Sequence, residues 1–276
     1  MLGSGDSVSD ERDLQARATE PGVDRISVLG AELEDLNADD VVARIFTALD
    51  AGTRARVINA NAYMLNLTYE NAWLRELFKA SEITFFDGVG AQLAARVLSG
   101  RHPRRTTPPE WVFDIARGVA KRGGSIYMLG GEKAAALKAS ERLSTATGVR
   151  IAGVRDGFFD HARGSNDNAA LLAEINAARP DVLFINMGMP RQERWLYDHW
   201  DQLDTSVAIT AGALVDHLAG RVRRPPKWVA DMGLEWLVRL AVEPARLWRR
   251  YVLGLPVFGW RVVRERLSVP AKSGDR

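Results

Sequence analysis

The sequence predicts an α/β fold: a mainly parallel sheet with helices on both faces, followed by a C-terminal helical appendage. Two observations predict it. Between residues 25 and 220, short apolar runs alternate with longer amphipathic segments, which is typical of βαβ units. Several of the short runs are almost wholly apolar, as in strands that helices cover on both sides. After Gly220 the composition changes to a basic segment rich in tryptophan.

The elements follow one another in regular order. We expect strands at 26–29, 57–60, 83–86, 125–129, 150–154, 182–186 and 207–210. Amphipathic helical patterns lie between them, at 39–49, 69–78, 110–121, 133–146, 168–178 and 192–203. In such a sheet the carboxyl ends of the strands line the ligand crevice. The residues that follow each strand are therefore the candidates for chemistry.

The segment after Gly220 reads as a pair of helices. Trp228, Met232, Trp236 and Leu240 recur at every fourth residue and form one apolar helix face. The proline at 244 ends this helix, and a second short helix should follow at 245–252.

Charge is unevenly distributed along the chain. Residues 221–276 hold 13 Lys and Arg against 5 Asp and Glu, whereas the preceding 220 residues hold 24 against 30. Such asymmetry indicates a basic module that meets an anionic partner. Two interpretations stay open on composition alone: a helical pair packed on the α/β domain, or a basic element that touches the headgroup region of a membrane.

We expect four segments: a disordered tail at 1–24, an α/β domain at 25–220, the appendage at 221–267 and a disordered tail at 268–276. The first 24 residues carry no apolar run of the kind a secretory signal needs. No stretch approaches the roughly 20 apolar residues of a spanning helix, so we expect a cytoplasmic protein. The chain has no cysteine, which excludes a disulfide scaffold, a thiolate zinc site and a cysteine nucleophile.

Polar residues follow the second and third predicted strands. Asp87 comes directly after a strand and before two glycines and a helix, where it would serve as a general base or as the cap of the helix beginning near Val89. Asn59 and Asn61 end the preceding strand, where amides would bind a sugar or a nucleobase or cap a turn. Arg105 lies in a basic loop before a helix capped by Thr107 and Glu110 and would bind phosphate or stay in solvent.

Two further strand ends carry glycines. Gly130 opens a strand-to-helix turn that suits a nucleotide phosphate or is a tight turn only. Gly188 precedes a helix whose first turn holds Gln192 and Glu193. Gln192 would point toward the crevice and read uracil or a sugar hydroxyl, and Glu193 complements the helix dipole.

Other kinds of site find little support. The four histidines show no ligand spacing, and no paired-aspartate DxD sequence occurs at a strand end, so we expect no metal. There is no GxSxG elbow, no Walker A loop and no full GxGxxG fingerprint.

Seven stretches, in this order, resemble the WecG/TagA/CpsF glycosyltransferases (glycosyltransferase family 26), from about Val28 to Arg266. They are INANAYML at 58–65, FFDGVG at 85–90, RRTTPPE at 104–110, RDGFF at 155–159, INMGMPRQERW at 185–195, GALVDHLAGRVRRPPKW at 212–228 and GLEWLVRLAVEPARLWRRY at 233–251.

The resemblance implies a Rossmann-like domain with a C-terminal appendage that closes the site and associates with the membrane. It implies metal-independent transfer, with inversion, of a sugar of the N-acetylmannosamine type from a UDP-sugar to a polyprenyl-diphosphate-linked acceptor. Such enzymes build cell-surface polysaccharide, teichoic acid or exopolysaccharide. The implied partners are the UDP-sugar, the lipid-linked acceptor and an anionic membrane surface at the inner face of the plasma membrane, with no nucleic acid, no cofactor and a possible homo-oligomer.

The resemblance also implies roles for single residues. Asp87 matches the family's catalytic base, and Asn59 falls where the family commonly has threonine at the active site, which is a departure. Val215 is a second departure, at a family phenylalanine. The substrate-binding matches are Asn61 at the donor, Arg105 at a phosphate, Gln192 and Glu193 near the donor, and Arg239, Arg246 and Arg249 over the active site.

Two other functions compete with this one. The first is a non-catalytic peripheral membrane protein that binds a nucleotide sugar, and the departure at Asn59 is the only feature that favours it. A dinucleotide-dependent oxidoreductase would need the complete glycine fingerprint and an acid about 20 residues beyond it, and the sequence shows neither.

Overall fold

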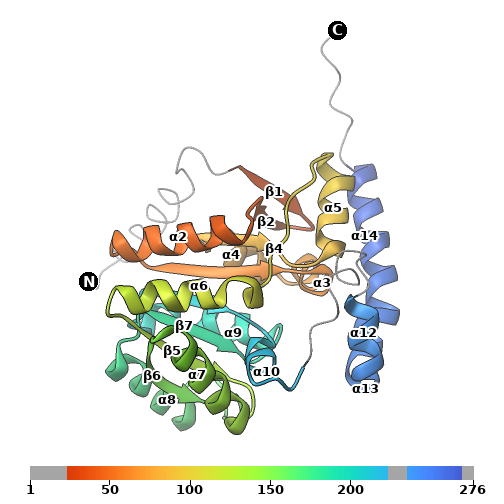
Figure 1. Ribbon diagram of the computed structural model, residues 1–276. Coiled ribbons are helices and arrows are strands. Elements are labelled where there is room, and N and C mark those ends of the chain that lie inside the picture. The colour runs from red at the N-terminus through yellow and green to blue at the C-terminus, as the bar shows by residue number, and fades with distance from the viewer. Residues whose placement is uncertain (1–23, 223–234, 269–276) are drawn as a thin grey trace, which may run out of the picture.

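The computed structural model describes residues 24–222 and 235–268 (Figure 1). The described residues form one sheet of eight strands in the order β1-β2-β4-β3-β8-β7-β5-β6. β1 and β2 pair antiparallel, and every other neighbouring pair is parallel. The strands are β1 (Arg25–Val28), β2 (Ala31–Glu34), β3 (Ala55–Ala60), β4 (Ile83–Phe86), β5 (Ser125–Gly130), β6 (Arg150–Arg155), β7 (Val182–Asn186) and β8 (Val207–Thr210).

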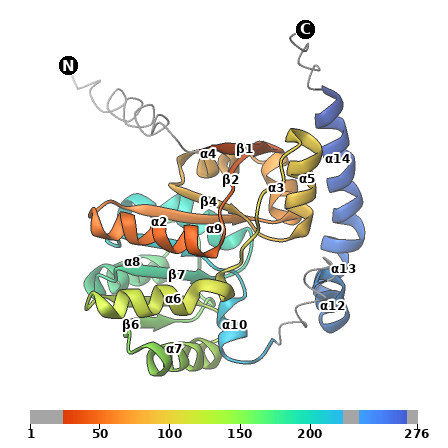
Figure 2. The same cartoon turned by 45° about the horizontal axis from the view of Figure 1, so that its top comes forward.

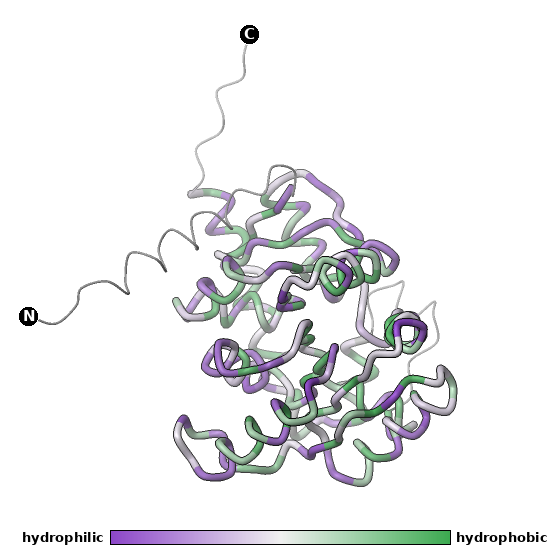
Figure 3. The backbone as a smooth tube through the Cα atoms, turned by 90° about the vertical axis from the view of Figure 1, so that its left-hand side faces the viewer, coloured by the Kyte–Doolittle hydropathy of each residue, from purple (hydrophilic) through white to green (hydrophobic). Residues whose placement is uncertain are grey.

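Helices cover both faces of the sheet, as the sequence predicts. One buried cluster joins the sheet to α2 (Ala38–Asp50), α6 (Pro108–Lys121), α7 (Lys133–Thr147) and α10 (Leu214–Leu218). The cluster on the other face joins it to α3 (Ala62–Glu70), α4 (Ala72–Ala80), α5 (Val89–Ser99), α8 (Asn166–Ala178) and α9 (Arg191–His199). The tube in Figure 3 shows hydrophobic segments toward the inside and hydrophilic ones on outer turns, which is the pattern that this layering requires.

All seven predicted strands are present, but the sequence reading missed β2. Its four residues read Ala-Glu-Leu-Glu, which carries no strong strand signal. The strand pairs with β1 and β4, and its Glu34 is only 1% exposed. The Glu34 carboxylate accepts from Arg44 at 2.5 Å and from Arg25 at 3.4 Å, and these cations offset the cost of burying its charge.

Two predicted helices were wrong in extent. The expected helix at 69–78 is two helices, α3 and α4, which meet at Asn71. The expected helix at 192–203 ends at His199, and a turn of 3-10 helix, η1 (Trp200–Gln202), follows it. Periodicity alone does not show such breaks, because the apolar residues of both halves continue to face the same core.

The appendage differs from the predicted helical pair. It consists of α12 (Glu235–Val242), α13 (Pro244–Trp248), a π-helical turn η2 (Arg249–Leu253) and α14 (Gly254–Ser268). Trp228 and Met232 of the predicted apolar face lie outside the described residues, as does the tail at 1–23. No described helix is both long and apolar enough to span a bilayer.

Helix α14 was not foreseen, and it packs on the α/β domain beside α3 and α5 (Figure 2). Its Phe258 and Val262 are buried in the same core cluster as the sheet. Asn66 of α3 donates to the Gly254 carbonyl at 2.8 Å, and the Leu29 backbone N–H donates to Glu265 at 3.3 Å. These contacts fix α14 against the domain, which places the appendage next to the strand ends.

Candidate active site

A crevice opens where neighbouring strands send their helices to opposite faces. β3 and β8 are adjacent and parallel, yet β3 leads into α3 on one face and β8 leads into α10 on the other. Ligands of open α/β sheets bind at such a switch point, at the carboxyl ends of the strands. Most of the predicted site residues lie at or just after the carboxyl ends of the strands, and the others lie in the loop before α6 or in the appendage.

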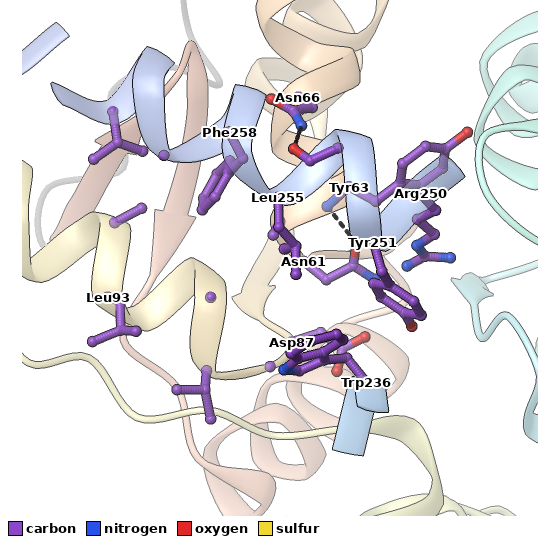
Figure 4. A pocket seen from close by; sticks show the side chains of 18 of the residues that line it. Asn61, Tyr63, Asn66, Asp87, Leu93, Trp236, Arg250, Tyr251, Leu255 and Phe258 are labelled. Carbon is purple, nitrogen blue, oxygen red and sulfur yellow. Dashed lines mark hydrogen bonds between the residues drawn. The ribbon is translucent and has the colours of Figure 1, made fainter. Parts of the chain in front are cut away.

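A cavity of about 510 Å³ lies at this edge (Figure 4). The α/β domain contributes Asn61, Tyr63, Asp87 and Arg105 to its wall. The appendage contributes Trp236, Arg250 and Tyr251, so the cavity is walled by both parts of the chain. Three of the predicted residues, Asn61, Asp87 and Arg105, therefore share one cavity.

Asp87 is held at the cavity wall by its backbone. Its N–H donates to the carbonyl of Ala60 at 2.9 Å, which ties the end of β4 to the end of β3. Gly88 follows with φ 95° and is itself the residue that caps α5, a conformation that glycine adopts without strain. Because Gly88 takes the cap position, Asp87 is not the cap of this helix. Its partly buried carboxyl lines the cavity.

The Asn61 side chain caps a helix and also lines the cavity. Its Oδ1 accepts from the backbone N–H groups of Tyr63 and Met64, both at 3.1 Å, and so caps α3. Its Nδ2 lies 3.3 Å from the sulfur of Met189, and the residue lines the cavity. The helix cap fixes the side chain, so the amide is presented to the cavity in one orientation.

Arg105 and its neighbour Arg104 have different surroundings, although both lie in the same loop. Arg104 turns outward and pairs with Asp35 at 3.1 Å and with Asp40 at 3.0 Å. Thr106 donates its N–H to the Phe86 carbonyl at 3.1 Å, which anchors the loop at the end of β4. Arg105 lies between these two anchors and lines the cavity. A guanidinium there suits a phosphate, because it offers paired donors and a fixed charge.

Asn59 lies behind the cavity rather than in its wall. The residue is 2% exposed, and its Nδ2 donates to the Thr210 carbonyl at 3.0 Å, joining β3 to β8. Its Oδ1 is buried and finds no hydrogen-bond partner among the described residues. A buried acceptor without a partner is costly, and a direct role of Asn59 in catalysis stays a prediction.

Gln192 and Glu193 form a buried pair at the start of α9. Both are fully buried, and the Gln192 amide donates to Glu193 at 2.7 Å. The Gln192 oxygen accepts from the N–H of Gly212 at 3.0 Å, at the end of β8. Burial raises the pKa of the Glu193 carboxyl from 4.5 to about 7. Both ends of the Gln192 amide are thus bound within the protein, and a donor contact by this residue stays a prediction.

The two predicted glycines shape neighbouring turns. Gly130 has φ 114°, and a Cβ there would lie 2.4 Å from the Asn186 backbone, so the ends of β5 and β7 approach as only glycine allows. Gly188 has φ 77° and open space on its Cβ side. Neither glycine is in the cavity wall, and their contact with the donor stays a prediction.

Among the appendage arginines whose side chains are described, Arg250 lines the cavity, and the sequence did not single it out. Its guanidinium carbon lies 4.5 Å from the ring centre of Tyr63 on α3. Arg249 is exposed, with its guanidinium 5.4 Å from the ring centre of Trp248. The side chains of Arg239 and Arg246 lie outside the described part of the structure. Both residues 249 and 250 lie in the π-helical turn η2, whose wider winding changes which side chains face the domain.

Within residues 24–222 and 235–268, no three His, Asp or Glu side chains gather closely enough to hold a metal ion. Transfer without a metal stays a prediction. Among the described side chains that line the cavity, the cations that could bind a phosphate are the guanidinium groups of Arg105 and Arg250.

Comparisons with known proteins identify the family of the chain. The model of the "Glycosyl transferase WecG/TagA/CpsF family" matches residues 26–272, nearly the whole described chain. A Bacillus subtilis (strain 168) protein, N-acetylglucosaminyldiphosphoundecaprenol N-acetyl-beta-D-mannosaminyltransferase, is 28% identical over 192 residues, which cover 69% of this chain and 72% of the relative. The protein therefore belongs to the WecG/TagA/CpsF family and is a glycosyltransferase, with Asp87 in the wall of its cavity.

Proposed function

We propose that the protein transfers a sugar of the N-acetylmannosamine type from a UDP-sugar to a polyprenyl-diphosphate-linked acceptor, with inversion and without a metal, in the synthesis of a cell-surface polysaccharide. The observation that carries the proposal is the position of Asp87 in the wall of a cavity that also presents Arg105 and Arg250. The reaction named for the relative, which joins N-acetylmannosamine to a sugar on diphosphoundecaprenol, supports the choice of substrates.

The chemistry needs one base and one set of cations. An acceptor hydroxyl oxygen attacks the anomeric carbon of the donor while the Asp87 carboxylate takes its proton. The bond from that carbon to the diphosphate oxygen breaks at the same time, and UDP leaves with the electron pair. A single displacement from the opposite side inverts the anomeric centre. Arg105 and Arg250 would stabilise the negative charge that develops on the leaving diphosphate.

The same proposal places the protein at the inner face of the plasma membrane. The acceptor's lipid is confined to the bilayer, so the site must reach its surface. Several large apolar side chains of the appendage are exposed, among them Leu253 at 53%, Trp260 at 67% and Leu267 at 80%. Arginines 264 and 266 are exposed on the same helix, α14. An apolar surface flanked by cations suits contact with anionic lipid.

The test is sugar transfer from a panel of UDP-sugars onto a short polyprenyl-diphosphate-linked N-acetylglucosamine. Asp87→Asn keeps the side chain's shape and removes the base, and we expect a loss of about 10²–10⁴-fold in kcat. Asp114→Asn is the matched control, because Asp114 is exposed on α6 and pairs with Arg117 of the same helix at 2.7 Å. EDTA should leave the wild-type rate unchanged.

The outcomes separate the parts of the proposal. Transfer that survives Asp87→Asn would move the base to another residue. Loss of transfer with EDTA would contradict the metal-independent mechanism. A protein that UDP-sugars protect against unfolding, but that transfers none of them, would be the non-catalytic binding protein.

A further inference from the structure

The cavity continues away from Asp87 as a groove between two helices. All the residues of α5 and α14 that line it are apolar or glycine. The larger ones are Leu93 and Val97 on α5, and Leu255, Phe258, Val262 and Val263 on α14. Leu93 and Val97 are four residues apart, and Leu255, Phe258 and Val262 are three and four residues apart, so each set lies on one face of its helix, with Val263 beside Val262. The two apolar faces share a cavity, and α5 and α14 are in contact.

The groove has a polar end and an apolar end. Helix α5 begins two residues after Asp87, and α14 begins directly after η2, which carries Arg250. Both helices run away from the site side by side (Figures 1 and 2). In Figure 4, Leu93 lies at one side of the cavity, and Arg250 and Tyr251 lie at the other. From Val89 to Val97 the lining extends for about 12 Å along α5, at 1.5 Å per residue.

The apolar end opens sideways to the surface. Leu93, Val97 and Val263 line the cavity and are also 54%, 47% and 48% exposed. On α14, Val263 has Trp260 three residues before it and Leu267 four residues after it, so the three side chains are neighbours on the helix surface. The rim of the groove therefore continues into the exposed apolar surface of the appendage.

One glycine keeps the groove wide. Gly259 lines the cavity between Leu255 and Val263, and a Cβ added there would meet no atom within 4 Å. The space beside it is empty of protein. A larger side chain at this position would project into the groove without disturbing the packing around it.

We propose that this groove holds the polyprenyl chain of the acceptor, and that the chain enters sideways from the bilayer between α5 and α14. The proposal rests on the function proposed above. The polar end offers guanidinium groups to a diphosphate and a carboxylate to the acceptor hydroxyl, and the apolar end matches an isoprenoid chain, which carries no polar group. Because Leu93 and Val97 belong to the α/β domain, this domain also faces the bilayer, and membrane contact is not confined to the appendage.

The experiment compares two acceptors with the same N-acetylglucosaminyl diphosphate head group, in detergent micelles so that membrane binding plays no part. One carries undecaprenol and the other a short water-soluble alkyl chain. We expect Leu93→Glu, Val97→Glu and Gly259→Leu each to lower the ratio of kcat/KM for the long acceptor to that for the short one by about tenfold, since each places charge or bulk where the chain would be buried. Leu137→Glu is the control: Leu137 is 51% exposed on α7, on the other face of the sheet.

The ratio distinguishes this proposal from the one on which it rests. If wild type uses both acceptors and no groove variant changes the ratio beyond the Leu137→Glu control, the groove does not hold the chain, and the proposed function stands. If wild type uses neither acceptor with any UDP-sugar, the proposed function itself is wrong. Circular dichroism and urea unfolding of each variant confirm that the comparison is between folded proteins.

Discussion

The amide of Gln192 donates a hydrogen bond to the carboxylate of Glu193 over 2.7 Å, and neither side chain has contact with solvent. The other end of the Gln192 amide holds the N–H of Gly212 at 3.0 Å. The pair thus joins the start of α9 to the end of β8, directly behind the crevice. Burial raises the pKa of Glu193 from 4.5 to about 7, so its ionisation falls in the physiological range.

This pKa predicts a pH dependence of stability. The folded protein holds the Glu193 proton more tightly than the unfolded chain does, so the stabilisation is complete below pH 4.5 and is lost as the pH rises to about 7. The loss is on the order of 3 kcal/mol for one fully buried group. Urea unfolding at pH 5 and pH 8 should show wild type losing this free energy and Glu193→Gln losing less. Glu141→Gln, on the exposed side of α7, is the control and should follow wild type; equal losses in all three proteins would contradict the prediction.

Asn59 predicts a contrast between two substitutions. Asn59→Asp would put a carboxylate oxygen against the Thr210 carbonyl, which the Nδ2 group now approaches at 3.0 Å. We expect it to cost about 3 kcal/mol or more of unfolding free energy, because a buried charge without a partner is strongly destabilising. Asn59→Thr introduces no charge, and because its shorter side chain would lose the hydrogen bond to Thr210 it should cost about 1 kcal/mol, the value of a single hydrogen bond. Similar unfolding midpoints for the two variants would show that the bond to Thr210 does not hold this side chain.

Neighbouring arginines in η2 should differ in their effect on transfer. Arg250 lines the cavity, whereas Arg249 is exposed beside Trp248. Arg250→Gln should lower kcat/KM by about 10²-fold, as the loss of one stabilising charge at a leaving group does. Arg249→Gln should lower it less. Steady-state kinetics with varied UDP-sugar measure both, and a larger effect at Arg249 would mean that η2 turns the other way in the working enzyme.

Binding to vesicles should depend on both charge and apolar side chains of α14. We expect flotation with anionic phosphatidylglycerol vesicles, weakened by salt because the Debye length shortens to about 3 Å at 1 M. Trp260→Gln should weaken it about tenfold by removing apolar surface from the contact. Phe158→Gln is a control, because Phe158 is an equally exposed aromatic residue, at 74%, on the loop after β6. Identical losses in the two variants would place the contact elsewhere.

The sequence predicts the α/β domain well because its strands are short apolar runs, a pattern typical of parallel strands that are buried on both faces. Asp87 and Asn61 could also be found, because each follows a strand that ends at the crevice, and Arg105 could be found because it lies in a basic loop before a helix. The prediction failed at β2, whose four residues read Ala-Glu-Leu-Glu and end in a buried acid. Glu34 pairs with Arg25 and Arg44, which lie outside the strand, so the four residues themselves do not show why the acid is buried.

The appendage was the least predictable part for a similar reason. Arg249 and Arg250 are adjacent and chemically identical, so the sequence alone does not show that Arg250 is the one that faces Tyr63 from η2. Pro256 discourages the prediction of a helix through 254–268, yet α14 forms there as a continuation of η2. Packing of Phe258 and Val262 into the domain then stabilises it.

The hydrogen bond from Leu29 to Glu265 joins residues 236 positions apart, and this separation sets an order of events during synthesis. The ribosome completes every strand of the sheet before it makes α14. A nascent domain can fold as a unit before later segments emerge, but here its α3 and α5 would remain uncovered on one side until α14 arrives. The wall that would hold a lipid is therefore the last part to assemble, and a chain that is still being translated has no complete site with which to take substrate from the membrane.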